Sequence, residues 1–121
     1  MRVTVDRVIY LRTAQTSDDR PHCFGYFITI HNDTESAVTV KARKWVVTEG
    51  EGRVTAVEGA GVVGQTPTIE PGESFSYNSF HLLADLRGVA EGSYLGIDAT
   101  GQRVLTRIPR FEMTVPSEGA E

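Results

Sequence analysis

A chain of 121 residues, 40% hydrophobic and 23% charged, has the length of one globular domain and can bury a core without a metal or a disulfide. No apolar run approaches the ~20 residues of a membrane helix, and Met1 is followed by a strand-like pattern instead of a signal peptide. The single cysteine, Cys23, excludes an internal disulfide, and the net charge of -4 disfavours a broadly basic nucleic-acid surface, so we expect a cytoplasmic domain that binds neither membrane nor nucleic acid.

Apolar residues in the first third of the chain recur at every second position, which predicts strands. The first strand runs from Val3 through Leu11, and the polar loop TAQTSDDRP follows it. Residues 24–30 form a second strand, with Phe24, Tyr26, Ile28 and Ile30 on one face. The segment NDTES then predicts a turn.

The third strand has apolar residues of two parities, namely Val38, Val40 and Ala42, followed by Trp45 and Val47. A regular strand cannot change faces, because a slip of one residue exchanges them. We therefore predict a β-bulge near Arg43–Lys44.

Further strands are predicted at residues 53–58, 75–82, 94–97 and 104–108, separated by turn signals such as PG and DATGQ. The parity of the last strand changes at Pro109, which predicts a bend there. Residues 81–90, HLLADLRGVA, are a short helical candidate. The pattern favours an all-β fold, an antiparallel β-sandwich of about seven to eight strands in one domain, 1–116, with a disordered tail at 117–121.

The segment GAGVVG, Gly59 to Gly64, has the G-x-G-x-x-G spacing that binds a pyrophosphate in dinucleotide-binding folds. That mechanism needs a helix directly after the motif, because the helix N-terminus presents free amides and a positive dipole end to the phosphates. The following segment contains Pro67 and Pro71 and has no helical periodicity. We therefore expect extended chain after Gly64.

Gly59, Gly61 and Gly64 are interpreted first as residues that allow positive φ and close backbone approach in a loop that crosses the sandwich, with Val62 and Val63 filling the core. A second interpretation stays open at the same residues. Consecutive amides can form an anion nest, which would bind phosphate or a nucleotide without a helix.

Several motifs follow one another along nearly the whole chain: RKW at 43–45, GAGVVG at 59–64, Pro67, PGESFSYNS at 71–79, GSY at 92–94 and IPRF at 108–111, with FGYFITIHN upstream. Together they resemble the ApaG family. The resemblance implies an immunoglobulin-like or fibronectin type III-like sandwich in a small bacterial cytoplasmic protein. It also implies a genetic association with cobalt resistance and magnesium efflux, and phosphate binding by the glycine motif has been suggested for the family.

In eukaryotic F-box and polymerase-delta-interacting proteins the same domain looks like a protein-interaction module. Two departures distinguish this chain. Lys44 stands where many members have an aromatic residue or histidine, and residues 81–92 replace a stretch that is usually rich in Ser, Thr and Pro. If that loop contacts a partner, the partner of this chain is expected to differ.

Metal and catalytic sites find little support in the sequence. His22 and Cys23 are adjacent, but neighbouring residues of a strand point to opposite faces and cannot easily share one ion. His31 and His81 are isolated, and no G-x-S-x-G motif is present. We therefore expect no metal, no cofactor and no enzymatic activity.

The last candidate site is a basic segment in which Arg43 and Lys44 precede Trp45. It is either a solvated strand face with Trp45 in the core, or a basic, partly aromatic edge that receives an acidic partner. Arg103, Arg107 and Arg110 would extend the basic surface. The overall prediction is a non-enzymatic binding module for an unknown protein partner, with phosphate or nucleotide binding at Gly59–Gly64 as the alternative.

Overall fold

The computed structural model describes residues 1–12 and 16–117, and in that part of the chain it contains eight strands and no helix. The strands are β1 (Arg2–Tyr10), β2 (His22–His31), β3 (Val38–Glu49), β4 (Arg53–Ala60), β5 (Thr68–Ile69), β6 (Ser74–Leu83), β7 (Arg87–Asp98) and β8 (Arg103–Thr114). The loop predicted at 13–21 and the tail predicted at 117–121 fall partly outside the described residues.

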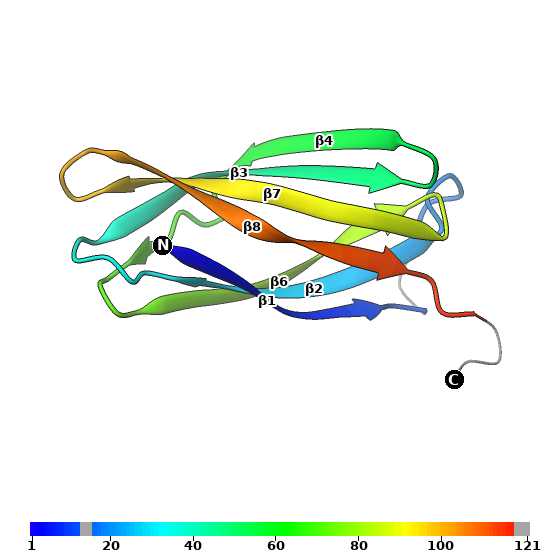
Figure 1. Cartoon of the computed structure of the whole chain (residues 1–121), viewed down its shortest axis with the longest axis horizontal. Coiled ribbons are helices and arrows are strands. Elements are labelled where there is room, and N and C mark those ends of the chain that lie inside the picture. Colours follow the sequence, from blue (N-terminus) through cyan, green and yellow to red (C-terminus); the bar gives the residue numbers. More distant parts are fainter. Residues whose placement is uncertain (13–15, 118–121) are drawn as a thin grey trace.

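The strands form two antiparallel sheets that lie one above the other (Figure 1). One sheet has the order β1-β2-β6. The other has the order β4-β3-β7-β8, and the short β5 pairs with β3 beyond the end of β4. The prediction of an antiparallel β-sandwich with about seven to eight strands is confirmed.

The prediction of a short helix at residues 81–90 is wrong. The segment ends β6 at Leu83, turns, and begins β7 at Arg87. The buried Glu49 fixes this turn, because its carboxylate accepts hydrogen bonds from the backbone amides of Ala84 (2.7 Å) and Asp85 (2.9 Å). A tertiary contact thus overrides the weak local helical pattern.

Both predicted irregularities exist, but one is displaced. The pairing of β3 with β7 shifts between Val40 and Ala42, so the extra residue is Lys41 and not Arg43 or Lys44. Ala42 therefore lines the outer surface together with Leu95, instead of sharing a face with Val40 as predicted. The second register shift lies at Pro109 in the edge strand β8, where the sequence predicts an irregularity.

The core lies between the sheets and takes residues from both of them. Its fully buried members include Ile28 and Ile30 from β2 and Tyr94 from β7. The hydroxyl of Tyr94 forms a hydrogen bond with that of Tyr77 on β6, so a polar contact joins the two sheets in the interior. Pairing the two hydroxyls avoids the cost of burying either one alone.

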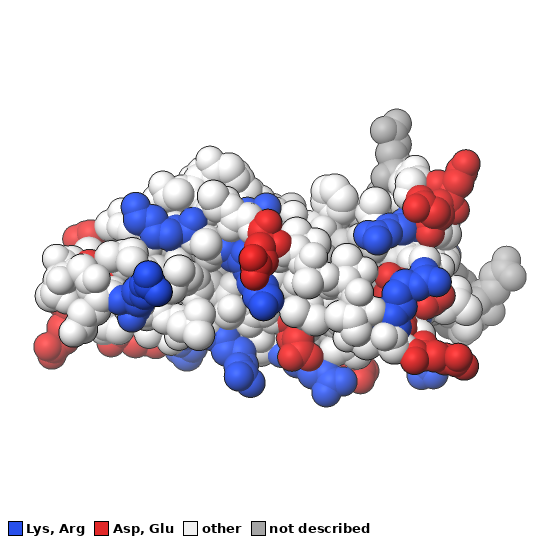
Figure 2. Space-filling view, turned by 90° about the horizontal axis from the view of Figure 1, so that it is seen from above, with Lys and Arg blue, Asp and Glu red and all other residues white. Residues whose placement is uncertain are grey.

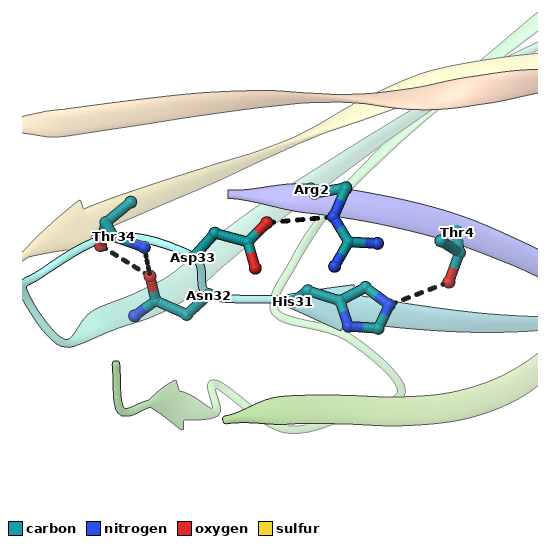
Figure 3. Close-up of polar contacts among 6 residues, drawn as sticks. All are labelled: Arg2, Thr4, His31, Asn32, Asp33 and Thr34. Atoms are coloured by element: carbon teal, nitrogen blue, oxygen red, sulfur yellow. Dashed lines mark hydrogen bonds and ion pairs between the residues drawn. The ribbon is translucent and has the colours of Figure 1, made fainter. Parts of the chain in front are cut away.

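At one end of the sandwich, the buried Asn32 organises the turn after β2 (Figure 3). Its Nδ2 donates to the carbonyls of Ser36 and Ile69, both at 2.8 Å, and its Oδ1 accepts from the amide and hydroxyl of Thr34. The exposed pair Arg2–Asp33 lies beside it at 3.0 Å. Asn32 therefore ties the turn to β5, and a change of its amide affects both.

Replacing Asn32 with Asp is expected to lower the free energy of unfolding by about 2–4 kcal/mol at neutral pH, because a carboxylate would face the two carbonyl oxygens and could not donate to them. Urea unfolding followed by circular dichroism measures the loss. Asn78→Asp, at an exposed position of β6, is the matched control. Equal effects of the two substitutions would contradict the role given to Asn32.

Candidate functional site

The glycine segment ends β4 and continues as a tight turn, without a helix. Gly59 and Ala60 are the last residues of β4, and the next regular element is β5. The expectation that no helix follows Gly64 is confirmed. The dipole and the row of free amides that hold a pyrophosphate in dinucleotide-binding folds are therefore absent from this segment.

Two of the three glycines have a backbone reason to be glycine, and Gly59 lies against a side chain. A Cβ at Gly59 would lie 2.8 Å from guanidinium nitrogens of Arg43, and a Cβ at Gly61 would lie 2.2 Å from the carbonyl oxygen of Gln65. Gly61 and Gly64 have φ of 65° and 79°, a region that favours glycine. The interpretation that the glycines allow positive φ and close backbone approach thus agrees with the geometry of Gly61 and Gly64, but not with that of Gly59, which lies within β4.

Most amides of this loop already have acceptors. The amides of Gly61, Val62 and Gln65 donate to the carbonyls of Lys41, Gln65 and Val62 at 2.7, 2.7 and 2.9 Å. At the tip of the turn, Val63 has a φ of 43°, which is strained for a β-branched residue. The prediction that Val62 and Val63 both fill the core is half right, since Val62 is fully buried and Val63 is 47% exposed.

Arg43 connects this loop with the interior of the sandwich. Its Nη1 donates to the carbonyl oxygens of Ala60 (2.9 Å) and Gly61 (3.2 Å). In the part of the chain that the structure describes, no carboxylate lies within ion-pair distance of Arg43. A half-buried positive charge is therefore held by carbonyl dipoles, without a counter-ion among those residues.

The three residues of the RKW segment do not form one surface. Lys44 lies on the outer face, where its Nζ is 3.6 Å from Oε1 of Glu58, and both side chains are exposed. Trp45 is only 3% exposed and packs inside against Tyr26 and His81, with ring centroids 5.0 and 4.7 Å away. Only Arg43 and Trp45 thus share a face, the inner one.

The outer face of the layer that contains β4, β3 and β7 carries side chains of both charges. In Figure 2, Lys and Arg are interspersed with Asp and Glu on a largely uncharged surface. We see no continuous basic area among the described residues on this face. On this face Arg107 of β8 and Lys44 of β3 line one groove together with Glu91, so the charges there are mixed.

A cavity of about 270 Å³ opens between the edge strands β4 and β6, and we call it the edge cavity. The residues that line it come from both sheets and include Arg20, Tyr26, Arg43, Trp45, Val57, Ser79, Phe80 and His81. The sequence predicts Arg43 and Trp45 as site residues, but not Tyr26, Ser79 or His81. One signal was present, since Tyr77, Ser79 and His81 place polar groups at alternate positions on the core-facing side of a strand.

The polar atoms of the edge cavity are incompletely paired. Nε1 of Trp45 and Nε2 of His81 are buried and have no hydrogen-bond partner among the described residues. Burial lowers the pKa of His81 to about 4, so the ring is neutral at pH 7. Burial also raises the pKa of Tyr26, an effect opposed by its hydrogen bond to Ser79 and by the charge of Arg43. The lining thus combines the half-buried cation of Arg43 with two buried ring nitrogens that have no partner among the described residues.

The remaining sequence candidates lie elsewhere. Cys23 is buried, and burial raises the pKa of its thiol, which disfavours the reactive thiolate. Nδ1 of His22 is 3.1 Å from the hydroxyl of Tyr10. Among residues 1–12 and 16–117, no three His, Cys, Asp or Glu side chains are grouped to hold a metal ion, and no helix is long and apolar enough to cross a membrane.

Comparison with known proteins gives the family. The family model of the ApaG domain (DUF525) matches residues 12–97. The ApaG protein of Shewanella pealeana is 40% identical over 115 residues, which are 94% of this chain and 91% of that protein. The chain belongs to the ApaG family. The ApaG protein of Deinococcus radiodurans is 39% identical over 119 residues, 98% of this chain and 92% of that protein.

A solved structure supports the same assignment at the level of the fold. The crystal structure of a protein from Bordetella pertussis, described as a putative ApaA protein, is 33% identical and aligns with a TM-score of 0.82 over 94% of each chain. Several of the motifs by which this chain resembles the ApaG family lie on one side of its sandwich. Arg43, Trp45, the glycine loop and Ser79 lie at or beside the edge cavity.

Lowering the pH from 6.5 to 4 is expected to destabilise the protein through His81, by up to roughly 3 kcal/mol. The unfolded chain binds a proton near the ordinary histidine pKa of 6.5, whereas the folded chain binds it only near pH 4. The stabilising contribution is therefore present above pH 6.5 and is lost as the pH falls through this window. Urea unfolding of wild type and His81→Leu at several pH values measures it.

The His81→Leu protein should lose this part of the pH dependence, whereas His31→Gln, at the other end of the same sheet, should retain it. The comparison isolates His81 from the carboxylates, because all three proteins carry the same Asp and Glu residues. An unchanged slope in His81→Leu would refute the assignment.

Proposed function

We propose that this ApaG-family chain is a non-enzymatic protein-binding module, and that it receives an extended segment of its partner at the free edge of β6. The proposal rests on a difference in the number of long strands between the two sheets. The β1-β2-β6 sheet has one long strand fewer than the β4-β3-β7-β8 sheet, and none of the described strands covers the inner face of β4. Val57 on that face is consequently 49% exposed.

Because of this difference in strand number, the two sheets contact each other along one edge of the sandwich and are separated along the other. The edge strands β1 and β8 contact each other across the layers, whereas β4 and β6 are not among the pairs of strands in close contact. A strand added beside β6 would pair with its free backbone groups and would lie opposite β4, covering Val57. This is β-strand addition, in which main-chain hydrogen bonds give affinity and inward side chains give specificity.

The composition of β6 supports its use as a docking edge. Natural proteins protect exposed edges with charged residues or proline. The edge strands β1, β4 and β8 all contain charged residues, and β8 also contains Pro109. Strand β6, SFSYNSFHLL, contains no Lys, Arg, Asp, Glu or Pro, and its Phe80 is 56% exposed. An unprotected edge beside an exposed aromatic side chain fits a surface that a partner covers.

A binding function of this kind requires no catalytic activity of the chain. Trp and Arg often anchor interfaces, and the edge cavity holds one of each at the docking edge. On this proposal the protein acts in the cytoplasm, and the association with cobalt and magnesium homeostasis that the family resemblance implies is indirect, through the partner.

A photo-cross-linking phenylalanine analogue placed at position 80 is expected to give a discrete covalent adduct with a partner protein in the native cell, because the docked strand would lie beside it. The matched control places the same analogue at Leu105, which is 74% exposed on the outer face of the other sheet. Gel mobility and mass spectrometry identify the adducts. No adduct from position 80, or the same adducts from both positions, would exclude the β6 edge as the docking site.

The alternative ligand, phosphate or nucleotide at Gly59–Gly64, has a separate test. Since three amides of the loop already donate to carbonyls, pyrophosphate, ATP and diadenosine polyphosphates at millimolar concentration are expected to leave the melting temperature unchanged. A ligand present at 100 times its Kd would instead add about 2.7 kcal/mol of stability. Such a stabilisation, lost in Gly64→Val, would restore the phosphate site.

A further inference from the structure

The edge cavity lies directly beneath the proposed docking edge, and its chemistry indicates what enters it. Ser79 and His81 are inward-facing residues of β6, so they mark the path that an inward side chain of an added strand would follow. Opposite them, Arg43 and Trp45 project from β3. A partner side chain at this point would be surrounded by both sheets.

The lining includes the guanidinium of Arg43 and the indole N–H of Trp45, which only donate, beside hydroxyls and a neutral histidine ring, which can also accept. Arg43 donates to two carbonyls and has no carboxylate beside it among the described residues. Nε1 of Trp45, a residue only 3% exposed, can only donate, and it lacks an acceptor in the described part of the chain. The one acidic residue of the lining, Glu49, uses its Oε1 to hold the amides of Ala84 and Asp85. The Glu49 carboxylate thus belongs to the lining, but it holds the turn after β6 and forms no ion pair with Arg43.

We propose that the edge cavity binds a carboxylate side chain, Asp or Glu, carried by the partner strand that docks on β6. The carboxylate accepts hydrogen bonds from the guanidinium of Arg43 and from Nε1 of Trp45. This inference rests on the proposed function and adds the chemistry of the partner. It turns the docking edge into one that selects an extended segment with an acidic residue at an inward position.

A single carboxylate matches the cavity better than the alternatives. A neutral or apolar side chain would leave the charge of Arg43 without a counter-ion in a site that docking closes to water, and leaving a buried charge unpaired is costly. A phosphate dianion would require more positive charge than one half-buried arginine, since Arg20 is exposed at the mouth. A carboxylate also fits the planar fork of the guanidinium.

The single tryptophan gives a direct readout of this site. Trp45 is the only tryptophan of the chain, so its indole N–H gives one side-chain signal in a nitrogen–proton correlation spectrum. The probes are two blocked pentapeptides, VTETV and VTQTV, which differ only in the central, inward residue. At constant ionic strength, VTETV is expected to shift the indole signal saturably, and VTQTV to bind at least about tenfold more weakly, because it lacks the charge-assisted hydrogen bonds.

Two arginine variants test which positive charge causes the preference for VTETV over VTQTV. Arg43→Gln is expected to abolish the tenfold preference for VTETV, whereas Arg110→Gln, an exposed arginine outside the edge cavity, should retain it. Melting curves show whether Arg43→Gln is folded, because Arg43 also holds the glycine loop. If that variant unfolds, the comparison of the two peptides on the wild-type protein decides alone.

The outcomes separate the two proposals. Equal binding of VTETV and VTQTV would overturn the carboxylate site and leave strand docking on β6 intact. Failure of VTETV to move the indole signal would also overturn the carboxylate site, while the cross-link at position 80 tests the docking edge independently. A preference that persists in a folded Arg43→Gln protein would overturn the role of Arg43.

Discussion

The extra residue at Lys41 is the constraint on which the candidate site depends. Before it, Val38 and Val40 face the core, and after it the inward positions are Arg43, Trp45 and Val47. In a regular strand the whole second half of β3 would be reversed. Trp45 would then project to solvent and Lys44 into the interior. The bulge thus delivers a cation and an indole to the open side of the sandwich.

Arg43 then couples two features that the sequence presents as separate motifs. Its guanidinium occupies the space that a side chain at position 59 would fill, and it holds the carbonyls of Ala60 and Gly61. Gly59 therefore leaves room for an arginine, whereas Gly61 and Gly64, and the amides of the loop, serve the turn. In dinucleotide-binding folds the same spacing turns the amides towards the ligand. Identical glycine spacing has opposite consequences in the two settings, because the motif leads into a helix in one and into a strand in the other.

The sequence predicted the features that depend on local periodicity and missed those that depend on contacts between sheets. The sandwich, the bend at Pro109 and the extended chain after Gly64 all result from alternation and turn residues. The sequence pattern predicts the bulge near Arg43–Lys44, whereas the extra residue is Lys41, because Ala42 is small and apolar and fits either face of the strand. His81 looked isolated, since its packing against Trp45 brings together residues that are 36 positions apart in different sheets. No pattern within one strand contains that information.

An unprotected edge also has to avoid pairing with a second copy of itself. Two β6 strands joined edge to edge would bring together two edge cavities that both present Arg43 and unpaired donors. The one carboxylate of each lining, that of Glu49, is buried and tied to the turn after β6 of its own chain, so a second copy would not bring it to Arg43. Self-pairing would therefore bury two uncompensated charges, whereas an acidic partner would neutralise one. The unpaired arginine can thus act in two ways, attracting the correct segment and penalising the wrong one, which is how specificity commonly arises at protein interfaces.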